Sequence, residues 1–274
     1  MMNTPAQIAE NYVTIGKGKV DTPIAKMFML AIMAGAFIAL GGLGATTAGV
    51  SIAEASVAKL VGACIFPGGL AMVLLAGAEL FTGNCLLSIP LLQREITVFG
   101  MLKNWGVVYA GNFVGGLIVA AIAVFSHQAS LFNNEMAVSM ISAAAAKTSL
   151  SFGDAFLKGI ACNFLVCIAV WLAFAAKTAS GKIISLFLPV MIFVLCGFEH
   201  SVANMYYIGA GLFAMLNPDY LLAATNAGID VSGLNIENFL AANLLPVTLG
   251  NIVGGAICVG MVYWFVYLKG SKKL

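Results

Sequence analysis

Charge is scarce in this sequence. Only 9% of its 274 residues are Asp, Glu, Lys or Arg, whereas 61% are hydrophobic, and the mean hydropathy is +1.01. Soluble globular domains carry about 25% charged residues, so the composition excludes an ordinary soluble domain and predicts a protein embedded in a membrane. The net charge of +2 is also too small to indicate binding to nucleic acid.

The clusters of polar residues that enzymes and metal sites require are missing too. The chain has two histidines and six cysteines, and no two cysteines form a Cys-x-x-Cys pair. We interpret the cysteines as small apolar packing residues. The apolar segments contain no paired carboxylates, no Ser/His pair and no set of metal ligands, so we expect neither an enzyme nor a bound metal or cofactor.

Two further absences narrow the class of membrane protein. The duplicated Asn-Pro-Ala boxes of aquaglyceroporins are missing, because Asn217-Pro218 is followed by Asp219 in a predicted loop. The segment Met1–Asp21 has no apolar core of the kind that signal peptides need. We expect it to form a short amphipathic helix on the cytoplasmic side.

Long hydrophobic runs, in contrast, are abundant. Six apolar stretches are long enough to cross the core of a bilayer, which takes about 20 helical residues. They are approximately Lys26–Val50, Val57–Leu92, Trp105–Ser126, Ala155–Ala176, Ile183–Met215 and Phe239–Leu268. The second and the fifth run well past about 25 residues and hold Pro, Gly and charge in the middle, so both are predicted to be broken helices.

The basic residues predict the orientation. Ten of the thirteen lie before the first stretch, between the second and third, between the fourth and fifth, or after the sixth. The three exceptions are Lys59, Lys147 and Lys158. Because loops rich in Lys and Arg stay in the cytoplasm, both termini are predicted to be cytoplasmic.

A pattern of Gly, Asn and Glu occurs twice in the chain. The first copy is Gly77-Ala78-Glu79-Leu80-Phe81-Thr82-Gly83-Asn84 with Gly111-Asn112-Phe113-Val114-Gly115-Gly116, and the second is Gly197-Phe198-Glu199-His200-Ser201-Val202-Ala203-Asn204 with Gly250-Asn251-Ile252-Val253-Gly254-Gly255. Such duplication is typical of a transporter or channel built from two related halves around one path.

The halves extend over about 26–126 and about 155–268, with three spans each. Since three is odd, they must be inverted relative to each other. We therefore expect an all-α membrane protein with a cytoplasmic segment, 1–25, a six-span domain, 26–268, and a cytoplasmic tail, 269–274.

Three ionisable residues lie deep within the predicted spans: Glu79, Glu199 and His200. Such groups are costly in lipid and indicate a functional site. The glutamates occupy matching positions, and we expect each to hold the backbone N–H groups of its own helix break. The counterpart of His200 is Leu80, so His200 is predicted to act alone as a hydrogen-bond donor at the centre of a pore, oriented by the hydroxyl of Thr82.

Three segments resemble those of the formate/nitrite transporter family. Two resemble its signature segments, Leu75-Ala76-Gly77-Ala78-Glu79-Leu80-Phe81-Thr82-Gly83 and Gly159-Ile160-Ala161-Cys162-Asn163-Phe164-Leu165-Val166-Cys167-Ile168-Ala169, and Gly197-Phe198-Glu199-His200-Ser201-Val202-Ala203-Asn204-Met205 resembles its central-histidine segment. Ile168 stands where the second signature more often has Leu or Val, which is a conservative departure. The resemblance extends from about Ile24 to Tyr267.

The resemblance implies an aquaporin-like fold in a homopentamer of the bacterial inner membrane, with a pore for small monovalent anions in each protomer. It implies that His200 is the central pore histidine with Thr82 as its partner, and that Leu80 also lines the pore. Hydrophobic constrictions are implied at Phe66 and Leu70 on one side and at Phe193 on the other. Lys147 is implied to draw anions into an outer vestibule, with Asn163 deeper in, and Asn204 to support the second break. Taken alone, Phe66, Leu70 and Phe193 are equally typical of a core, and Lys147 of a solvated loop.

Two transport modes fit such a pore. Apolar constrictions around one titratable donor let an anion pass while they select for its size and basicity. A desolvated anion beside His200 favours sharing of a proton, so lower pH is expected to alter the flux. We favour a pH-sensitive passive channel, and the alternative is a proton-coupled symporter. The N-terminal segment, with Lys17 and Lys19, is a candidate gate.

The substrate is less well defined by the residues. The family handles formate, nitrite and hydrosulfide. Glu199 and Tyr206-Tyr207 resemble the formate and hydrosulfide branches more than the nitrite branch, and Thr82-Gly83-Asn84-Cys85 tips the prediction slightly towards hydrosulfide.

Overall fold

Helices account for all of the regular structure that the computed structural model describes, which is residues 2–270. The last residues of the predicted tail, 271–274, lie outside the described part. The elements are α1 (Pro5–Asp21), α2 (Ile24–Gly49), α3 (Ala55–Ile65), α4 (Pro67–Ala76), α5 (Phe81–Asn84), η1 (Cys85–Leu87), α6 (Ser88–Leu92), α7 (Val98–Phe125), η2 (Gln128–Ser130), α8 (Glu135–Thr148), α9 (Phe152–Ala175), α10 (Ala179–Leu195), α11 (Ser201–Ala214), α12 (Pro218–Asn226), the π-helical η3 (Asn238–Leu244), α13 (Leu245–Ile252), the π-helical η4 (Val253–Met261) and α14 (Val262–Tyr267).

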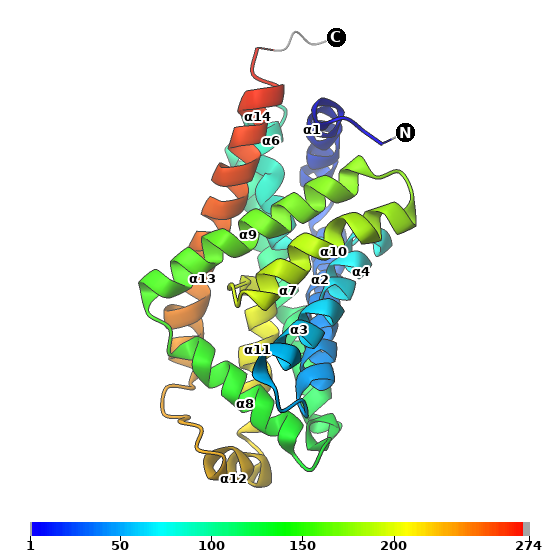
Figure 1. Cartoon of the computed structure of the whole chain (residues 1–274). Coiled ribbons are helices and arrows are strands. Elements are labelled where there is room, and N and C mark those ends of the chain that lie inside the picture. Colours follow the sequence, from blue (N-terminus) through cyan, green and yellow to red (C-terminus); the bar gives the residue numbers. More distant parts are fainter. Residues whose placement is uncertain (1, 271–274) are drawn as a thin grey trace.

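The helices form an elongated bundle with both chain ends at the same end (Figure 1). We call this the terminal end, and we call the opposite end, where α8 and α12 lie, the distal end. Five helical runs are long and apolar enough to cross a membrane: Ile24–Gly49, Ala55–Ala76, Val98–Phe125, Phe152–Ala175 and Asn238–Tyr267. The predicted fifth stretch is not among them, because it is divided between α10 and α11, each too short to span alone.

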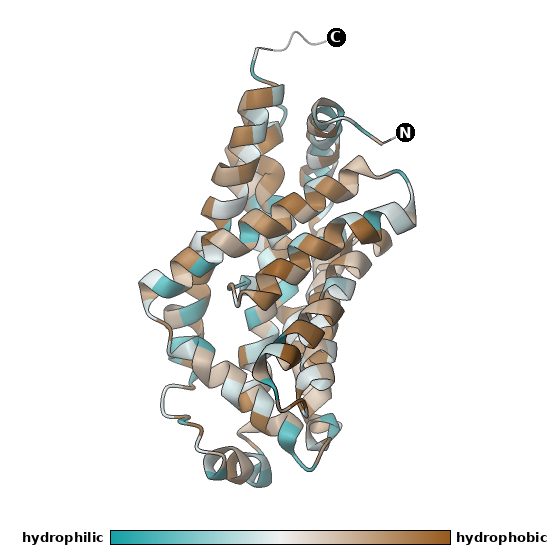
Figure 2. Ribbon diagram, in the orientation of Figure 1, coloured by the Kyte–Doolittle hydropathy of each residue, from teal (hydrophilic) through white to brown (hydrophobic). Residues whose placement is uncertain are grey.

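The lateral surface is hydrophobic. Hydrophobic residues predominate along α9, α10 and α14 (Figure 2). Large side chains such as Phe99, Leu157 and Ile184 are 78%, 64% and 73% exposed. A soluble protein would leave few such groups in water, so this surface is suited to lipid or to other copies of the chain.

The second and fifth predicted stretches are broken, as the sequence predicted. α4 ends at Ala76, directly before Gly77, and α10 ends at Leu195, two residues before Gly197; these glycines have φ values of 78° and 68°. Both values are left-handed, a conformation in which glycine has no Cβ to strain. Four residues separate α4 from α5, and five residues separate α10 from α11.

Glycine also sets the spacing between helices. α2 packs along α7, and α9 along α13. A Cβ at Gly115 of α7 would meet the carbonyl oxygen of Ile32, and one at Gly250 of α13 would meet that of Phe156. The repeated Gly-Asn-x-x-Gly-Gly motif therefore brings two pairs of helices into backbone contact, as small residues do in membranes.

Two helices were not expected from the sequence. α8 lies in the connection before the fourth predicted stretch, and α12 begins at the predicted loop of Asn217-Pro218. α8 is rich in alanine, which favours helix, and its buried face includes Met136, Met140 and Ile141. It packs on α11 and α12, and Lys147 lies in its last turn.

We predict that Gly115→Ala destabilises the protein while Gly106→Ala, on the same helix, does not. A Cβ at Gly115 collides with backbone atoms of α2, whereas nothing lies within 4 Å of a Cβ at Gly106. Overpacking of this kind costs about 1–3 kcal/mol. Thermal unfolding of the two purified variants in detergent measures the difference, and equal unfolding temperatures would refute the close-packing role.

Candidate functional site

A buried asparagine bonds both sides of the first helix break. Asn112 of α7 donates from Nδ2 to the carbonyl oxygens of Ala31 (2.7 Å) and Glu79 (2.9 Å), and its Oδ1 accepts the N–H of Phe81 (2.9 Å). The carbonyl of Glu79 and the N–H of Phe81 lie where the helix is interrupted, and a membrane offers them no water. One amide side chain therefore bonds both of these groups and ties the break to Ala31 of α2.

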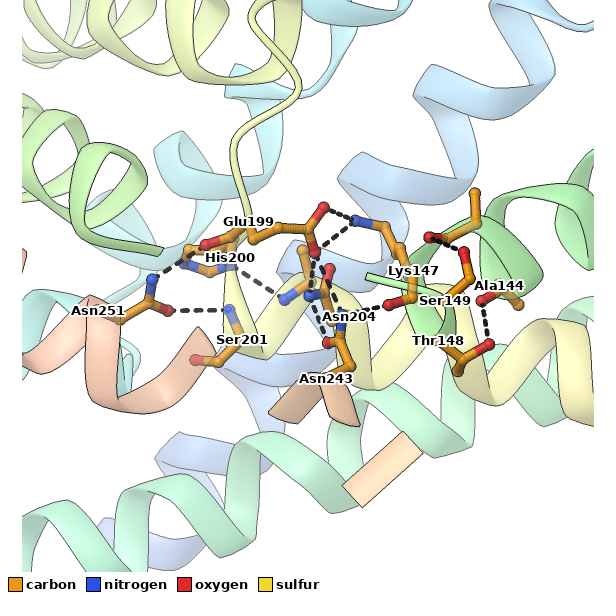
Figure 3. A network of polar contacts seen from close by, with 12 residues as sticks. Ala144, Lys147, Thr148, Ser149, Glu199, His200, Ser201, Asn204, Asn243 and Asn251 are labelled. Atoms are coloured by element: carbon orange, nitrogen blue, oxygen red, sulfur yellow. Dashed lines mark hydrogen bonds and ion pairs between the residues drawn. The ribbon is translucent and has the colours of Figure 1, made fainter. Parts of the chain in front are cut away.

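Asn251 of α13 does the same in the second break. Its Nδ2 donates to the carbonyl oxygens of Gly159 (2.8 Å) and Glu199 (3.0 Å), and its Oδ1 accepts the N–H of Ser201 (2.9 Å). Figure 3 shows Asn251 bonded to both sides of His200. Both asparagines belong to the repeated sequence pattern, but no role was predicted for them. Their position after a glycine in both copies of the pattern was a signal of this role.

The prediction that Glu79 and Glu199 hold the backbone N–H groups of their helix breaks was wrong. The carboxylate of Glu79 pairs with Lys19 Nζ (2.7 Å) and accepts from Asn84 Nδ2 (2.7 Å). Within residues 2–270, the hydrogen bonds of Glu79 and Glu199 carboxylates come from side chains, not from the backbone of the breaks. The asparagines hold the backbone, and a buried carboxylate needs a cation to offset its desolvation.

The second glutamate has the matching partners (Figure 3). Both carboxylate oxygens of Glu199 accept from Lys147 Nζ (2.8 and 3.0 Å), and Oε2 also accepts from Asn204 Nδ2 (2.6 Å). The side chain of Lys147 is 18% exposed. Lys147 is therefore an ion-paired residue of a helix, and the alternative of a solvated loop lysine was wrong. Asn204 bonds the glutamate of the second break.

A second pair of asparagines completes these networks. Asn104 Oδ1 accepts from Asn84 Nδ2 (2.9 Å), and Asn243 Oδ1 accepts from Asn204 Nδ2 (2.8 Å). Asn104 and Asn243 each lie eight residues before the asparagine of their break, so this spacing was a signal that the sequence analysis missed. The side chains of Asn84, Asn104, Asn204 and Asn243 are all buried.

His200 and Thr82 join the two half-helices. His200 is the N-cap of α11: its Nδ1 accepts the N–H of Ala203 (3.0 Å), and its Nε2 lies 2.8 Å from Oγ1 of Thr82, which belongs to α5. A neutral imidazole has one N–H, and Nδ1 is used as an acceptor. We therefore assign the proton to Nε2, which donates to Thr82 Oγ1.

Two small cavities lie near this pair and share part of their lining. One is lined by Ile38, Phe66, Leu70, Leu80, Val166, Val190, Phe193 and His200. The other is lined by Tyr12, Lys19, Leu70, Val73, Leu74, Ala78, Leu80, Gly83, Asn84, Val170 and Phe174. Leu70 and Leu80 border both cavities, so these two side chains separate them.

The aromatic side chains are grouped differently from the arrangement that the resemblance implied. Phe66 and Phe193 are in contact, with their rings edge to face and their centroids 5.6 Å apart, and both line the cavity beside His200. Phe193 also stacks on the imidazole of His200, 5.9 Å away. The residues expected at the constrictions therefore pair as Phe66 with Phe193 and as Leu70 with Leu80.

Asn163 of α9 is hydrogen-bonded to the backbone of Thr82. Its Nδ2 donates to the carbonyl oxygens of Thr82 (3.2 Å) and Asn251 (2.7 Å), and the side chain is fully buried. These bonds tie α9 to α5 and α13. Such a location is that of a positioning residue rather than of a residue open to a vestibule.

α1 covers the terminal end of the second cavity. The Tyr12 hydroxyl donates to the carbonyl oxygen of Gly83 (3.2 Å), and Lys19 reaches Glu79 at the first break. At the start of the helix, Asn3 Nδ2 donates to the carbonyl oxygen of Phe174 (2.9 Å). The N-terminal segment thus forms the predicted helix and contacts the residues that follow the first break.

Comparison with known proteins agrees with this geometry. A sequence model described as formate/nitrite transporter matches residues 6–265. The chain belongs to the formate/nitrite transporter family. Members of this family are transporters and channels rather than enzymes. Several long apolar helices in the chain agree with a multi-pass membrane protein of this family.

Named relatives include several formate proteins. The chain is 38% identical to a probable formate transporter of Methanothermobacter thermautotrophicus, with 97% of each chain covered. It is 40% identical to the formate channel FocA of Haemophilus influenzae, with 85% of this chain and 84% of that protein covered.

Solved structures of family members have the same fold. A pentameric formate channel with formate bound superimposes with a TM-score of 0.80 at 35% identity, and the match covers 89% of this chain and 98% of that one. An FNT family ion channel gives a TM-score of 0.79 at 29% identity, with 96% and 98% covered.

We predict that Lys147→Met destabilises the protein by about 3–5 kcal/mol, because it leaves the buried Glu199 carboxylate without its cation. The double variant Lys147→Met/Glu199→Gln is expected to recover most of this loss, since a Gln oxygen still accepts from Asn204. Thermal unfolding in detergent compares the variants. A double variant no more stable than the single one would contradict the ion-pair account.

Proposed function

We propose that this protein is a passive channel for small monovalent anions of weak acids, with formate as the first candidate. The observation that carries the proposal is the His200–Thr82 pair, which stands between apolar side chains where two half-helices meet. One hydrogen-bonding site in an otherwise apolar passage offers a partner to a small anion without a fixed charge that would trap it.

The bonds of His200 favour a passive channel over a proton-coupled symporter. His200 could act as an acid only after it took up a second proton at Nδ1. That proton would displace the N–H of Ala203 and remove the cap of α11. A neutral imidazole instead donates from Nε2, and when Thr82 accepts this bond its own hydroxyl hydrogen is free to bond a passing anion.

The matched networks support two inverted halves of an aquaporin-like fold. Glu79, Lys19, Asn84 and Asn104 correspond in order to Glu199, Lys147, Asn204 and Asn243. Lys19 belongs to α1 and Lys147 to α8, and these two helices lie at opposite ends of the bundle (Figure 1). We propose that the chain crosses the bacterial inner membrane six times with both termini in the cytoplasm, and that it assembles as a homopentamer.

Formate is placed first because the named relatives at 38–40% identity are formate proteins. Hydrosulfide and nitrite are alternative substrates for the same pore, since all three are small conjugate bases of weak acids. The apolar passage selects by size, and the donor selects by basicity. α1 is proposed to gate the cytoplasmic end through Tyr12 and Lys19.

We predict that wild-type proteoliposomes take up formate down its own gradient, with or without a pH gradient. His200→Asn is expected to alter the flux. Thr82→Val is expected to lower it about tenfold, the effect of one hydrogen bond of about 1.4 kcal/mol at the barrier. Isotope uptake at fixed protein content measures all three.

Thr82→Ser is the matched control, because it keeps the hydroxyl and should keep the flux. Parallel assays with hydrosulfide and nitrite identify the preferred anion. Formate accumulation above its equilibrium level that collapses with the pH gradient would establish the symporter instead. Equal flux through wild type and His200→Asn would remove His200 from the mechanism.

A further inference from the structure

The hydrogen bonds at the two breaks establish which residues of α2 and α9 correspond. The N–H of the glutamate in each break donates to one carbonyl oxygen, that of Leu30 on α2 in the first half and that of Lys158 on α9 in the second. The asparagine of each break donates to the next residue along, Ala31 or Gly159. Counting along the two helices from these pairs matches each residue of α2 with one of α9.

Two residues of α9, Val170 and Phe174, line the cavity that α1 covers. Val170 Cγ2 lies 3.6 Å from the position that a Cβ at Gly83 would occupy, so this side chain projects towards the start of α5. The matching residues of α2 are Gly42 and Thr46. Both are smaller, so α2 leaves room in the distal half of the passage for another side chain.

The phenol ring of Tyr207 occupies that room. A Cβ at Gly42 would lie 3.1 Å from Cζ of Tyr207 and 3.2 Å from its hydroxyl oxygen, and the hydroxyl interacts with the side chain of Thr46. Lys147 Nζ lies 5.5 Å from the centre of the ring, and the counterpart of Lys147, Lys19, lines the cavity at the terminal side. The ring therefore contacts three positions whose counterparts line that cavity.

The first half has no ring at the matching place. Counting from Gly77 and Gly197, the counterpart of Tyr207 is Leu87. Leu87 is fully buried, and its Cδ2 lies 3.1 Å from the position of a Cβ at Gly16 of α1. It is not among the described residues that line the cavity. Tyr207, in contrast, is only half-buried, so the two halves differ in what fills the passage.

We propose that Tyr207 is a gate at the distal end of the pore: its ring closes the passage beside α2, and an anion passes when the ring turns aside. The inference rests on the proposed function, since the passage is the path of the conducted anion. A tyrosine suits this role because its ring is rigid and turns about two side-chain bonds. The absence of a side chain at Gly42 gives the ring its closed position.

The test measures access to Thr46, which lies beneath the ring. Thr46→Cys is introduced into a chain whose exposed or partly exposed cysteines are replaced by alanine, at Cys64, Cys196 and Cys258. A small charged methanethiosulfonate is added to the purified protein in detergent, and mass spectrometry follows the modification. Tyr207→Ala is expected to accelerate it about tenfold, the gain for a ring that is turned aside roughly a tenth of the time.

Matched variants serve as controls. Tyr207→Phe keeps the ring and should keep the slow modification, whereas Tyr207→Leu places the first-half residue there and should accelerate it. Tyr207→Leu also replaces Tyr207→Ala if the alanine variant does not fold. Ser232→Cys, in the exposed loop between α12 and η3, should react equally fast with Tyr207 and with Tyr207→Ala.

Formate uptake into proteoliposomes separates this inference from the proposed function. If wild type conducts formate, Tyr207→Ala should raise the initial rate, because one barrier in the path is removed. If wild type conducts no formate, the proposed function fails, while the modification rates still decide whether the ring closes the passage. Equal modification of Thr46→Cys with Tyr207 and with Tyr207→Ala would overturn the gate, and so would fast modification with Tyr207→Phe.

Discussion

Every interrupted helix inside a membrane leaves backbone groups that water cannot reach, and the rest of this structure depends on how they are bonded. Asn112 and Asn251 each bond one break twice and a neighbouring helix once, through a single amide. Each unmet group would cost several kcal/mol in hydrocarbon. Because the amides meet this need, the glutamates are free to pair with lysines.

The bonded backbone of the second break fixes the position of His200, which has no histidine counterpart in the first half. His200 occupies the position of Leu80 in the first half, and the start of α11 fixes its ring through Nδ1. Thr82, from the other half, accepts the hydrogen bond that Nε2 donates. The two breaks are thus bonded in matching ways, and in the proposed channel the unmatched residue His200 supplies the hydrogen bond to the anion.

The sequence predicted those features that recur along the chain. The length of the apolar stretches and the duplicated glycines were sufficient to predict two broken helices. The depth of His200 within its stretch was sufficient to predict a histidine where they meet. The pairing of Lys19 with Glu79 was not predictable in this way, because it joins positions 60 residues apart through packing that no local pattern encodes. The same holds for Phe66 beside Phe193, and α8 was missed because its alanine-rich sequence has little hydrophobic contrast.

The most direct test of this account is the protonation of His200 itself. The chain has only two histidines, so a His127→Asn variant labelled with ¹⁵N-histidine gives the signals of His200 alone. In lipid bilayers at neutral pH, solid-state NMR should find a protonated Nε2 and an unprotonated Nδ1. A proton on Nδ1, alone or together with one on Nε2, would contradict a neutral donor held by the N–H of Ala203.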